Sequence, residues 1–260
     1  MAGGREDRGA LEAGAMLILG IETATAQVGC AIGSHEGVRA SFQVAKGRRH
    51  AESLVPGIDF VRRQACIELD EIGAVAADVG PGLFTGLRVG VVTAKAMAMA
   101  LRVPVIGISS LDLLAFPVRW TSRRIVSVVD ARRGEVFYAF YRQVPGGVQR
   151  LSEQRVGSPD ELYSEIQATG EECLAVGDGA LRYAEGLQDL TRVEIGDAGL
   201  AHPSAGSLVQ LAHAQAIREE FINSWELQPV YLRKADVDIN WQTRHPVVRG
   251  EGTAQSGTVG

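Results

Sequence analysis

Residues 78–90 read DVGPGLFTGLRVG, and this stretch decides the fold. An apolar run over 72–79 leads into it and a run of helix formers over 91–102 leads out of it. This pattern predicts a strand, a glycine-rich turn and a helix. Gly80 and Gly82 permit a tight turn around Pro81, and Thr85 is expected to cap the helix.

The predicted helix carries small residues every four positions, so they share one face: Gly86, Gly90, Ala94 and Ala98. A glycine inside a helix costs about 1 kcal/mol relative to alanine, so a close contact with another element is expected to compensate. Packing within the same domain and a helix–helix contact with another protein both fit. A third interpretation, a phosphate-binding loop formed by Gly80, Gly82 and Gly86, has less support than these two. The lysine and the serine or threonine of a P-loop are missing.

The composition is that of an ordinary globular protein, with 46% apolar and 22% charged residues over 260 positions. A net charge of −5 argues against a broadly basic nucleic-acid surface and leaves room for a small basic patch. The three cysteines form no CxxC pair, which favours a reducing cytoplasm. No uncharged apolar stretch is long enough to cross a bilayer, so no membrane association is expected.

The chain divides into four parts on these criteria. Residues 1–15 are expected to be a disordered extension, because charges interrupt any apolar core of a secretory signal. Residues 16–117 and 118–233 are expected to form two lobes. Residues 234–260 end in a stretch rich in glycine, threonine and serine and are expected to be mostly disordered.

The two predicted lobes repeat one plan. Strands are expected at 17–22, 28–32 and 38–44 and again at 125–130, 136–142 and 148–156, each set followed by a helix. Glu22 and Asp130 end the first strand of each set, and in both cases the return strand begins six residues later. A repeated β-β-β-α-β-α order predicts an α/β, duplicated, two-lobed actin-like fold (ASKHA, ribonuclease-H-like), with coincidence of two hairpins as the alternative. A last edge segment is expected at 227–233.

The turns that define this fold contain Glu22 and Thr23 in the first lobe, Gly80 and Gly82 before the long helix, and Asp130, Arg132 and Arg133 in the second lobe. In nucleotide-binding proteins of this architecture, the paired turns hold phosphates. The first turn here, at 23–27, has neither the aspartate nor the glycines that such ATPases generally use. The two arginines could meet a phosphate or an acidic partner, or simply be solvated.

Six segments together resemble one known family over residues 16–233. They are LGIETAT at 19–25, RHAE at 49–52, the glycine-rich stretch at 80–90, AK at 94–95, DARRGEVF at 130–137 and QPVYLR at 228–233. The sequence is similar to the TsaB (YeaZ) family. This resemblance implies a non-catalytic scaffold subunit that binds and activates TsaD, the subunit that transfers a threonylcarbamoyl group to tRNA. The acceptor is the adenosine next to the anticodon in tRNAs reading codons that begin with A.

The resemblance also implies partners and a binding surface. TsaE, an ATPase, joins the complex, tRNA is held mainly through TsaD, and the isolated subunit can form a homodimer. ATP and a metal act in the partner subunits, so no cofactor of this chain's own is expected. The implied contact helices are 50–64 and 85–102, with contact residues His50, Leu54, Ile58, Val61, Gly86, Arg88, Gly90, Ala94 and Ala98. On this expectation, a bulky residue at Gly90 abolishes TsaD binding and leaves the monomer folded.

The resemblance also implies a difference from catalytic relatives, which is a pair of histidines that this chain lacks. TsaD-like relatives place two histidines at i and i+4 after the next strand, where both imidazoles can hold a metal. Ser110 and Leu114 stand at these positions here, and no HExxH or GxSxG motif is present. We therefore expect no catalytic, cofactor or metal residues. The alternative is an independent ATP- or metal-dependent hydrolase or kinase of the same fold, once described as a glycoprotease type, which Glu22 and Asp130 would serve.

Overall fold

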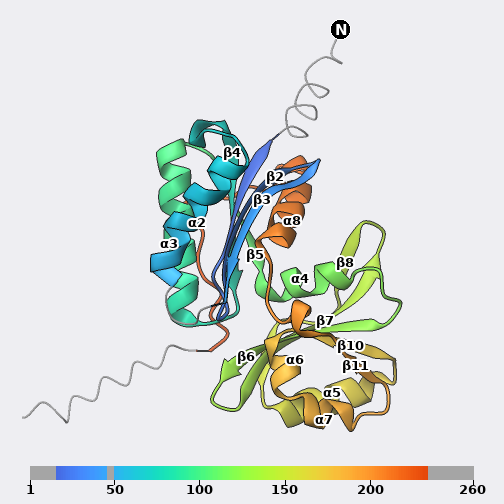
Figure 1. Cartoon of the computed structure of the whole chain (residues 1–260). Helices are drawn as coiled ribbons and strands as arrows, with labels where there is room; N and C mark the ends of the chain where they lie inside the picture. Colours follow the sequence, from blue (N-terminus) through green and yellow to red (C-terminus); the bar gives the residue numbers. More distant parts are fainter. Residues whose placement is uncertain (1–15, 46–49, 234–260) are drawn as a thin grey trace, which may run out of the picture.

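The computed structural model describes residues 16–45 and 50–233, which form two α/β lobes (Figure 1). The predicted disordered extension and tail, 1–15 and 234–260, lie outside the described residues. Each lobe is built on one sheet with helices against it. The fold class expected from the repeated plan is confirmed.

The first sheet has the order β3-β2-β1-β4-β5. β1 (Leu17–Glu22), β2 (Val28–Ser34) and β3 (Gly37–Val44) form an antiparallel meander. β4 (Ile72–Gly80) and β5 (Val105–Ser109) run parallel to β1. Every residue of β1 and β2 is buried, because helices cover both faces of this sheet.

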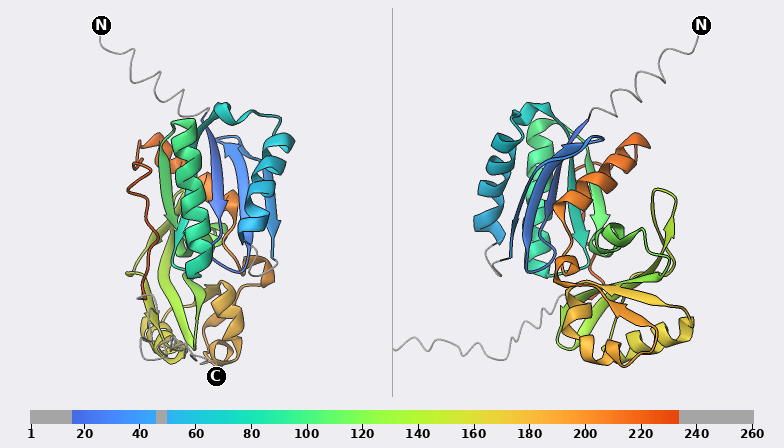
Figure 2. Two further views of the ribbon diagram at one scale, coloured as in Figure 1. Left: turned by 90° about the vertical axis from the view of Figure 1, so that its left-hand side faces the viewer. Right: turned by 45° about the vertical axis from the view of Figure 1, so that its right-hand side comes forward.

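Three helices cover the first sheet. α2 (His50–Gln64) and α3 (Phe84–Leu101) lie on one face, and α8 (Ala205–Ile217) lies on the other (Figures 1 and 2). α8 buries Leu208 and Val209 in the same apolar cluster as Ile18 of β1. The expected lobe boundary at 117/118 is therefore incomplete: the chain returns to the first lobe after building the second, because the open face of the first sheet needs apolar cover.

The second sheet has the order β8-β7-β6-β10-β11, which repeats the first strand for strand. The strands in this order are β6 (Arg124–Arg132), β7 (Glu135–Val144), β8 (Gly147–Arg150), β10 (Cys173–Val176) and β11 (Val193–Ile195). A sixth strand, β9 (Arg155–Gly157), pairs with β7 outside this order. β6, β7 and β8 are antiparallel neighbours, while β10 and β11 continue in parallel. The internal duplication is thus real and not a coincidence of hairpins.

The remaining elements are short. The helices are α4 (Ser110–Ala115), α5 (Pro159–Thr169), α6 (Asp178–Arg182) and α7 (Ala184–Gln188), with 3-10 turns at Leu69–Glu71, Phe116–Val118 and Ala198–Leu200. Ser109, Ser158 and Ser204 accept hydrogen bonds from backbone N–H groups at the starts of α4, α5 and α8.

Three local expectations were wrong. The strand expected at 148–156 is interrupted, because β8 and β9 (Arg155–Gly157) pair separately with β7. Residues 227–233, all of them described, contain no strand, although Val230 N donates to Val79 O at 2.7 Å. Thr85 does not cap α3, which begins at Phe84 with Leu83 preceding it and no side-chain cap. The tight turn at Gly80, with φ +98°, is present.

Candidate functional site

The turn between β1 and β2 is closed by the chain's own helices. Thr23 Oγ1 donates to the carbonyl oxygen of Gly86 at 2.8 Å, and Leu83 N donates to the carbonyl oxygen of Ala24 at 2.7 Å. His50 Nε2 lies 2.8 Å from the carbonyl oxygen of Thr25. Residues 23–25 are at most 1% exposed. The starts of α2 and α3 therefore cover the turn that the sequence comparison matched with a phosphate-holding turn.

The glycines before and within α3 permit this closure. A Cβ added at Gly82 would lie 2.2 Å from Ala24 O, and one added at Gly86 would lie 2.2 Å from Thr23 O. At Gly90 it would lie 2.2 Å from Thr23 Oγ1. The small-residue stripe thus packs against this chain's own first turn, which is the intramolecular alternative. The expectation that Gly90 can take a bulky residue without unfolding the monomer is corrected by this geometry.

The other predicted contact residues also face inward, with one exception. His50, Leu54, Ile58 and Val61 on α2, and Ala94 and Ala98 on α3, are buried, mostly in the cluster beneath both helices. Only Arg88 has an exposed side chain, which stacks 3.8 Å from the ring centroid of Phe84. Apart from Arg88, the residues predicted to contact a partner lie on the buried faces of α2 and α3, because small residues mark close packing of any kind.

The outward surface of α3 is apolar, and the sequence analysis missed it. Val92 is 63% exposed and Met99 is 69% exposed, with Ala96 exposed between them. We call Val92, Ala96 and Met99 the outer α3 face; α3 stands at the front of the left view of Figure 2. Their spacing of four and three residues places them on one side of the helix, opposite the buried stripe. This spacing was the available signal.

Apolar residues on both sides give α3 an unusual composition. Among the described helices it is the one long and apolar enough to cross a membrane by length and hydropathy, with 18 residues and a mean hydropathy of 1.3. The inner side packs on the first sheet, particularly β4. The outer side has no cover within the described residues, and an exposed apolar helix face commonly marks an interaction site.

Two buried acids lie beside the closed turn. Glu22 Oε1 accepts from Ala24 N at 2.7 Å, and Asp78 Oδ1 accepts from Gly80 N at 2.8 Å. Their second oxygens have no hydrogen-bond partner among the residues described. Burial raises the pKa of Asp78 to about 7. Burial, followed by the nearby Asp78 charge, raises the pKa of Glu22 well above its usual range.

The positions of the missing histidines are occupied by structural side chains. Ser110 is fully buried and its Oγ donates to Asp78 Oδ1 at 2.6 Å. Leu114 is buried in the apolar cluster that joins α4 to the second sheet. Within residues 16–45 and 50–233, no three histidine, cysteine, aspartate or glutamate side chains come together as a metal-ligand group.

The corresponding turn between β6 and β7 is open and basic. Arg132 and Arg133 have positive φ angles of 65° and 58°, and both are exposed. Arg132 Nη1 donates to Asp130 Oδ2 at 2.9 Å, and Asp130 N donates to Asp178 Oδ1 at 2.9 Å. Of the predicted turn residues, the structure brings Glu22 and Thr23 together with Gly80 and Gly82. It brings Asp130 together with Arg132 at the other hairpin.

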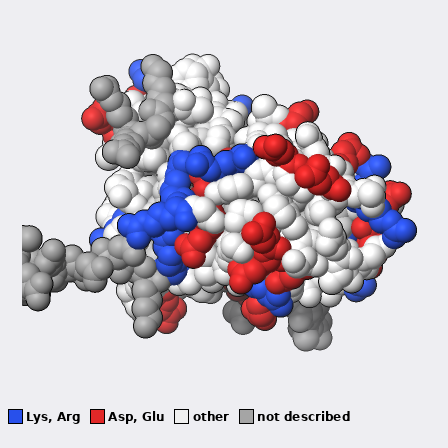
Figure 3. Space-filling model, turned by 90° about the horizontal axis from the view of Figure 1, so that it is seen from below, with Lys and Arg blue, Asp and Glu red and all other residues white. Residues whose placement is uncertain are grey.

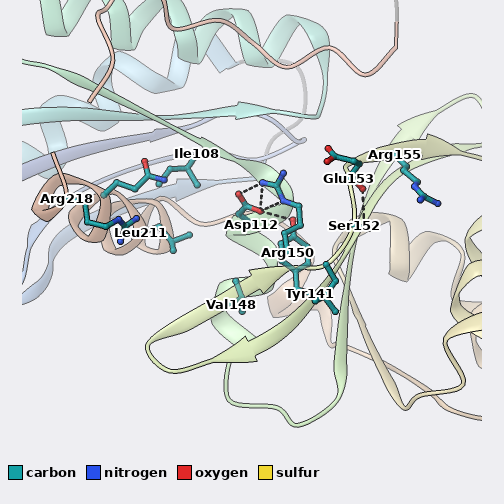
Figure 4. A pocket seen from close by; sticks show the side chains of 12 residues that line it. Ile108, Asp112, Tyr141, Val148, Arg150, Ser152, Glu153, Arg155, Leu211 and Arg218 are labelled. Atoms are coloured by element: carbon teal, nitrogen blue, oxygen red, sulfur yellow. Dashed lines mark hydrogen bonds and ion pairs between the residues drawn. The ribbon is translucent and has the colours of Figure 1, made fainter. Parts of the chain in front are cut away.

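A cleft of about 780 Å³ lies between the lobes (Figure 4). Asp112 on α4 forms an ion pair of 2.7 Å with Arg150 of β8, and Tyr141 Oη donates to Asp112 Oδ1 at 2.8 Å. Burial, followed by the Asp112 charge, raises the pKa of the Tyr141 hydroxyl. Asp112 lies between Ser110 and Leu114, the two positions compared with the histidines. The structure places it in a contact that ties α4 to the second sheet.

Comparison with known proteins points to one group. The family model described as "TsaD: tRNA N6-adenosine threonylcarbamoyltransferase" matches residues 43–241. The chain is 28% identical to the tRNA threonylcarbamoyladenosine biosynthesis protein TsaB of Escherichia coli, over 84% of this chain and 95% of that protein. It is 27% identical to the protein of the same name from Bacillus subtilis, over 87% and 98%. The solved structure of YeaZ from Pseudomonas aeruginosa superposes with a TM-score of 0.72 at 26% identity, covering 84% of this chain and all of that one.

Proposed function

The chain belongs to the TsaD-related family of tRNA N6-adenosine threonylcarbamoyltransferase proteins, among them TsaB (YeaZ), and we propose that it is a non-catalytic subunit that binds and activates TsaD. In this role the chain supports transfer of a threonylcarbamoyl group to the adenosine next to the anticodon of tRNAs reading codons that begin with A. TsaE is a further partner, tRNA is held mainly through TsaD, and the site of action is the cytoplasm.

The outer α3 face carries this proposal. Val92 and Met99 are more than half exposed on a long helix, and such a surface is stabilised when a partner covers it. Burying apolar area contributes roughly 25 cal/mol per Å². On α2, Val55 is 63% exposed and widens the apolar area on the same side of the sheet. A second copy of this chain would use the same face when TsaD is absent.

The closed first turn argues for a role without chemistry of its own. The polar groups of residues 23–25 form hydrogen bonds with the starts of α2 and α3. Phosphate binding at this turn would therefore require breaking native contacts. Ser110 and Leu114 supply one hydrogen bond and one core contact where the relatives' histidines would act. These observations support placing ATP and metal chemistry in the partner subunits.

The test exchanges apolar for charged side chains on the outer α3 face. Val92→Glu combined with Met99→Glu is expected to weaken TsaD binding in calorimetry at least 100-fold, because burying unpaired charge at an interface is costly. Ile217→Glu is the matched control: Ile217 is 54% exposed at the end of α8, on the opposite face of the first sheet. The control is expected to bind TsaD normally.

A tRNA modification assay with purified TsaD and TsaE completes the test. Activity should depend on this chain and should fall in the double variant but not in Ile217→Glu. Unchanged TsaD affinity in the double variant would show that TsaD binds a surface other than the outer α3 face. Stoichiometric metal, or micromolar ATP binding by the purified chain alone, would instead support the independent enzyme.

A further inference from the structure

Glu22 and Asp78 lie side by side at the ends of neighbouring strands. β1 and β4 are parallel, and Ile21 of β1 pairs with Ala77 of β4, so the next residues of the two strands are also neighbours. Adjacent strands are about 4.8 Å apart, which brings the two carboxyl groups within reach of each other. Because side chains alternate along a strand, both acids point to the side of the sheet that α8 covers, as does Ala76.

Each acid uses one oxygen to hold a turn, while its other oxygen has no partner. Glu22 Oε1 accepts from Ala24 N, and Asp78 Oδ1 accepts from Gly80 N and from Ser110 Oγ. Both acids are at most 1% exposed, and Glu22 Oε2 and Asp78 Oδ2 are buried without a hydrogen-bond partner among the described residues. A buried carboxylate oxygen without a partner is costly. A proton held between these two oxygens would satisfy both.

The charges that act on the pair are negative. At the surface, many acidic side chains lie beside basic ones, as the face seen from below shows (Figure 3). The buried pair instead experiences the charge of Asp178 of α6 at Glu22 and that of Asp112 of α4 at Asp78. The charged groups around these two further acids are Arg150, which pairs with Asp112, and Asp130, Arg132 and His202, which act on Asp178. Burial raises the pKa of both members of the pair, that of Asp78 to about 7, and the Asp78 charge raises the pKa of Glu22 further.

We propose that Glu22 and Asp78 share one proton between Oε2 and Oδ2, and that this proton is a pH-dependent switch beneath the start of α3. Asp78 already accepts from two donors, so the proton belongs mainly to Glu22, which donates to Asp78 Oδ2. When the proton leaves to solvent, two buried charges face each other and repel. The switch needs no partner protein.

The two turns that the pair holds also meet α3. Ala24 O accepts from Leu83 N, which directly precedes α3, and Gly80 ends β4 just before this junction. A Cβ added at Gly82 would lie 2.2 Å from Ala24 O, so the two turns are in close contact. Repulsion between the acids therefore loosens the turns on which the start of α3 rests.

The proton stabilises the fold while it is bound. In the unfolded chain, both acids ionise near their ordinary pKa values of about 4, whereas the folded state raises the pKa of Asp78 to about 7. Between these values, unfolding releases the shared proton. The unfolding equilibrium constant should therefore rise by up to about tenfold per pH unit.

Glu22→Gln and Asp78→Asn, made singly and together, test whether one proton serves both acids. The amide of Glu22→Gln can donate to Asp78 Oδ2 as the proton does, but it cannot be lost to solvent. We expect each single variant to lose most of the pH dependence and the double variant to lose no more. Glu36→Gln combined with Asp70→Asn removes two exposed acids and should keep the original slope. Urea titrations between pH 5 and 8 measure these slopes.

Hydrogen exchange tests the loosening of the turns. After correction for intrinsic rates, the protection of the Ala24 and Gly80 amides should fall about tenfold between pH 6 and 8.5 in the unchanged protein. Glu22→Gln should retain it. The matched control is the Arg132 amide, which donates to Asp130 Oδ1 at 2.9 Å in the equivalent turn of the second lobe. Its protection should stay constant.

The outcomes separate a shared proton from two independent acids. A slope that falls by half in each single variant and disappears only in the double variant would overturn the shared proton, as would unchanged slopes in all variants. Constant protection of Ala24 and Gly80 across this pH range would overturn the switch. If one single variant does not fold, the other gives the same comparison with the unchanged protein.

Discussion

The β1–β2 and β6–β7 hairpins occupy equivalent places in two sheets of identical strand order, yet they have opposite surroundings. Thr23, at the first turn, is fully buried and bonded to α3. Arg132 and Arg133, at the second, are exposed and strained. The first strand-end acid, Glu22, faces no cation within hydrogen-bond range among the described residues, whereas Asp130 faces two arginines.

The helices account for the difference. α3 has 18 residues and its glycines allow it to press on the first turn. The element at the corresponding place in the second lobe, α6, has five residues and offers Asp178 to Asp130 instead. In a duplicated fold, one strand-end turn can thus be buried by packing while the equivalent turn stays open to solvent. The following experiments test this contrast, in order of decreasing effect.

Gly90→Leu tests how tightly the first turn is closed. The new side chain would meet Thr23 Oγ1 at its first carbon, so we expect a loss of more than about 4 kcal/mol of unfolding free energy, or insoluble protein. Ala96→Leu, on the outer side of the same helix, is the control and should change stability by less than about 0.5 kcal/mol. Chemical denaturation measures both, and a stable Gly90→Leu protein would contradict the closure.

Asp78→Asn tests the buried acids behind the closed turn. The pKa of Asp78 is raised from 3.8 to about 7, so the folded state holds this proton more tightly than the unfolded state. Its contribution to stability is therefore greatest below about pH 4 and is lost as the pH rises to about 7. Between pH 5 and 8, the loss is up to about 3 kcal/mol.

The asparagine variant keeps an acceptor oxygen for Gly80 N and removes this titration. Its unfolding free energy should fall less steeply between pH 5 and 8 than that of the unchanged protein, in urea titrations at each pH. Asp70→Asn, at an exposed position, is the control and should keep the original slope. Parallel pH profiles for all three proteins would exclude a strongly raised pKa at Asp78.

Thr23→Val removes the hydroxyl that joins the first turn to α3. Loss of the 2.8 Å hydrogen bond to Gly86 O should cost about 1 to 2 kcal/mol. Thr23→Ser retains the donor and should lose less. If serine and valine destabilise the protein equally, the side chain contributes packing and not this hydrogen bond.

Arg133→Gly, in the second hairpin, should raise the unfolding free energy, whereas Thr23→Val lowers it. Relief of a positive φ at an exposed position is expected to stabilise the fold by about 0.5 to 1 kcal/mol. Arg142→Gly, within β7, is the control and should destabilise the protein, because glycine weakens a strand interior. A destabilised Arg133→Gly protein would show that the tip is held by its contacts and is not under strain.

Much of the architecture could be predicted from local pattern. Apolar runs ending at Glu22 and Asp130 predicted where both meanders begin, and the glycine-rich stretch predicted the β4–α3 junction. These features depend on residues close together in the chain, whose periodicity and hydrogen bonding act within a few positions.

The candidate site was less predictable, because it depends on which face of an element meets which neighbour. Spacing alone marked the stripe of small residues on α3 but could not say that Gly90 faces Thr23, 67 positions away. Nor could it show that Val92 and Met99 remain uncovered. Gly86, Gly90, Ala94 and Ala98 are buried within the chain, so they offer no accessible surface to a partner in this structure.

The sequence by itself determined a duplicated α/β chain with a glycine-rich junction and with Ser110 and Leu114 after the following strand, since these are properties of residue identity and short-range periodicity. Only the tertiary structure decided that α8 returns to the first sheet, that the first turn is filled and that the second is open. The physical reason is that burial is a long-range property: a side chain becomes core or surface according to the element packed against it, and that element can come from the far end of the chain.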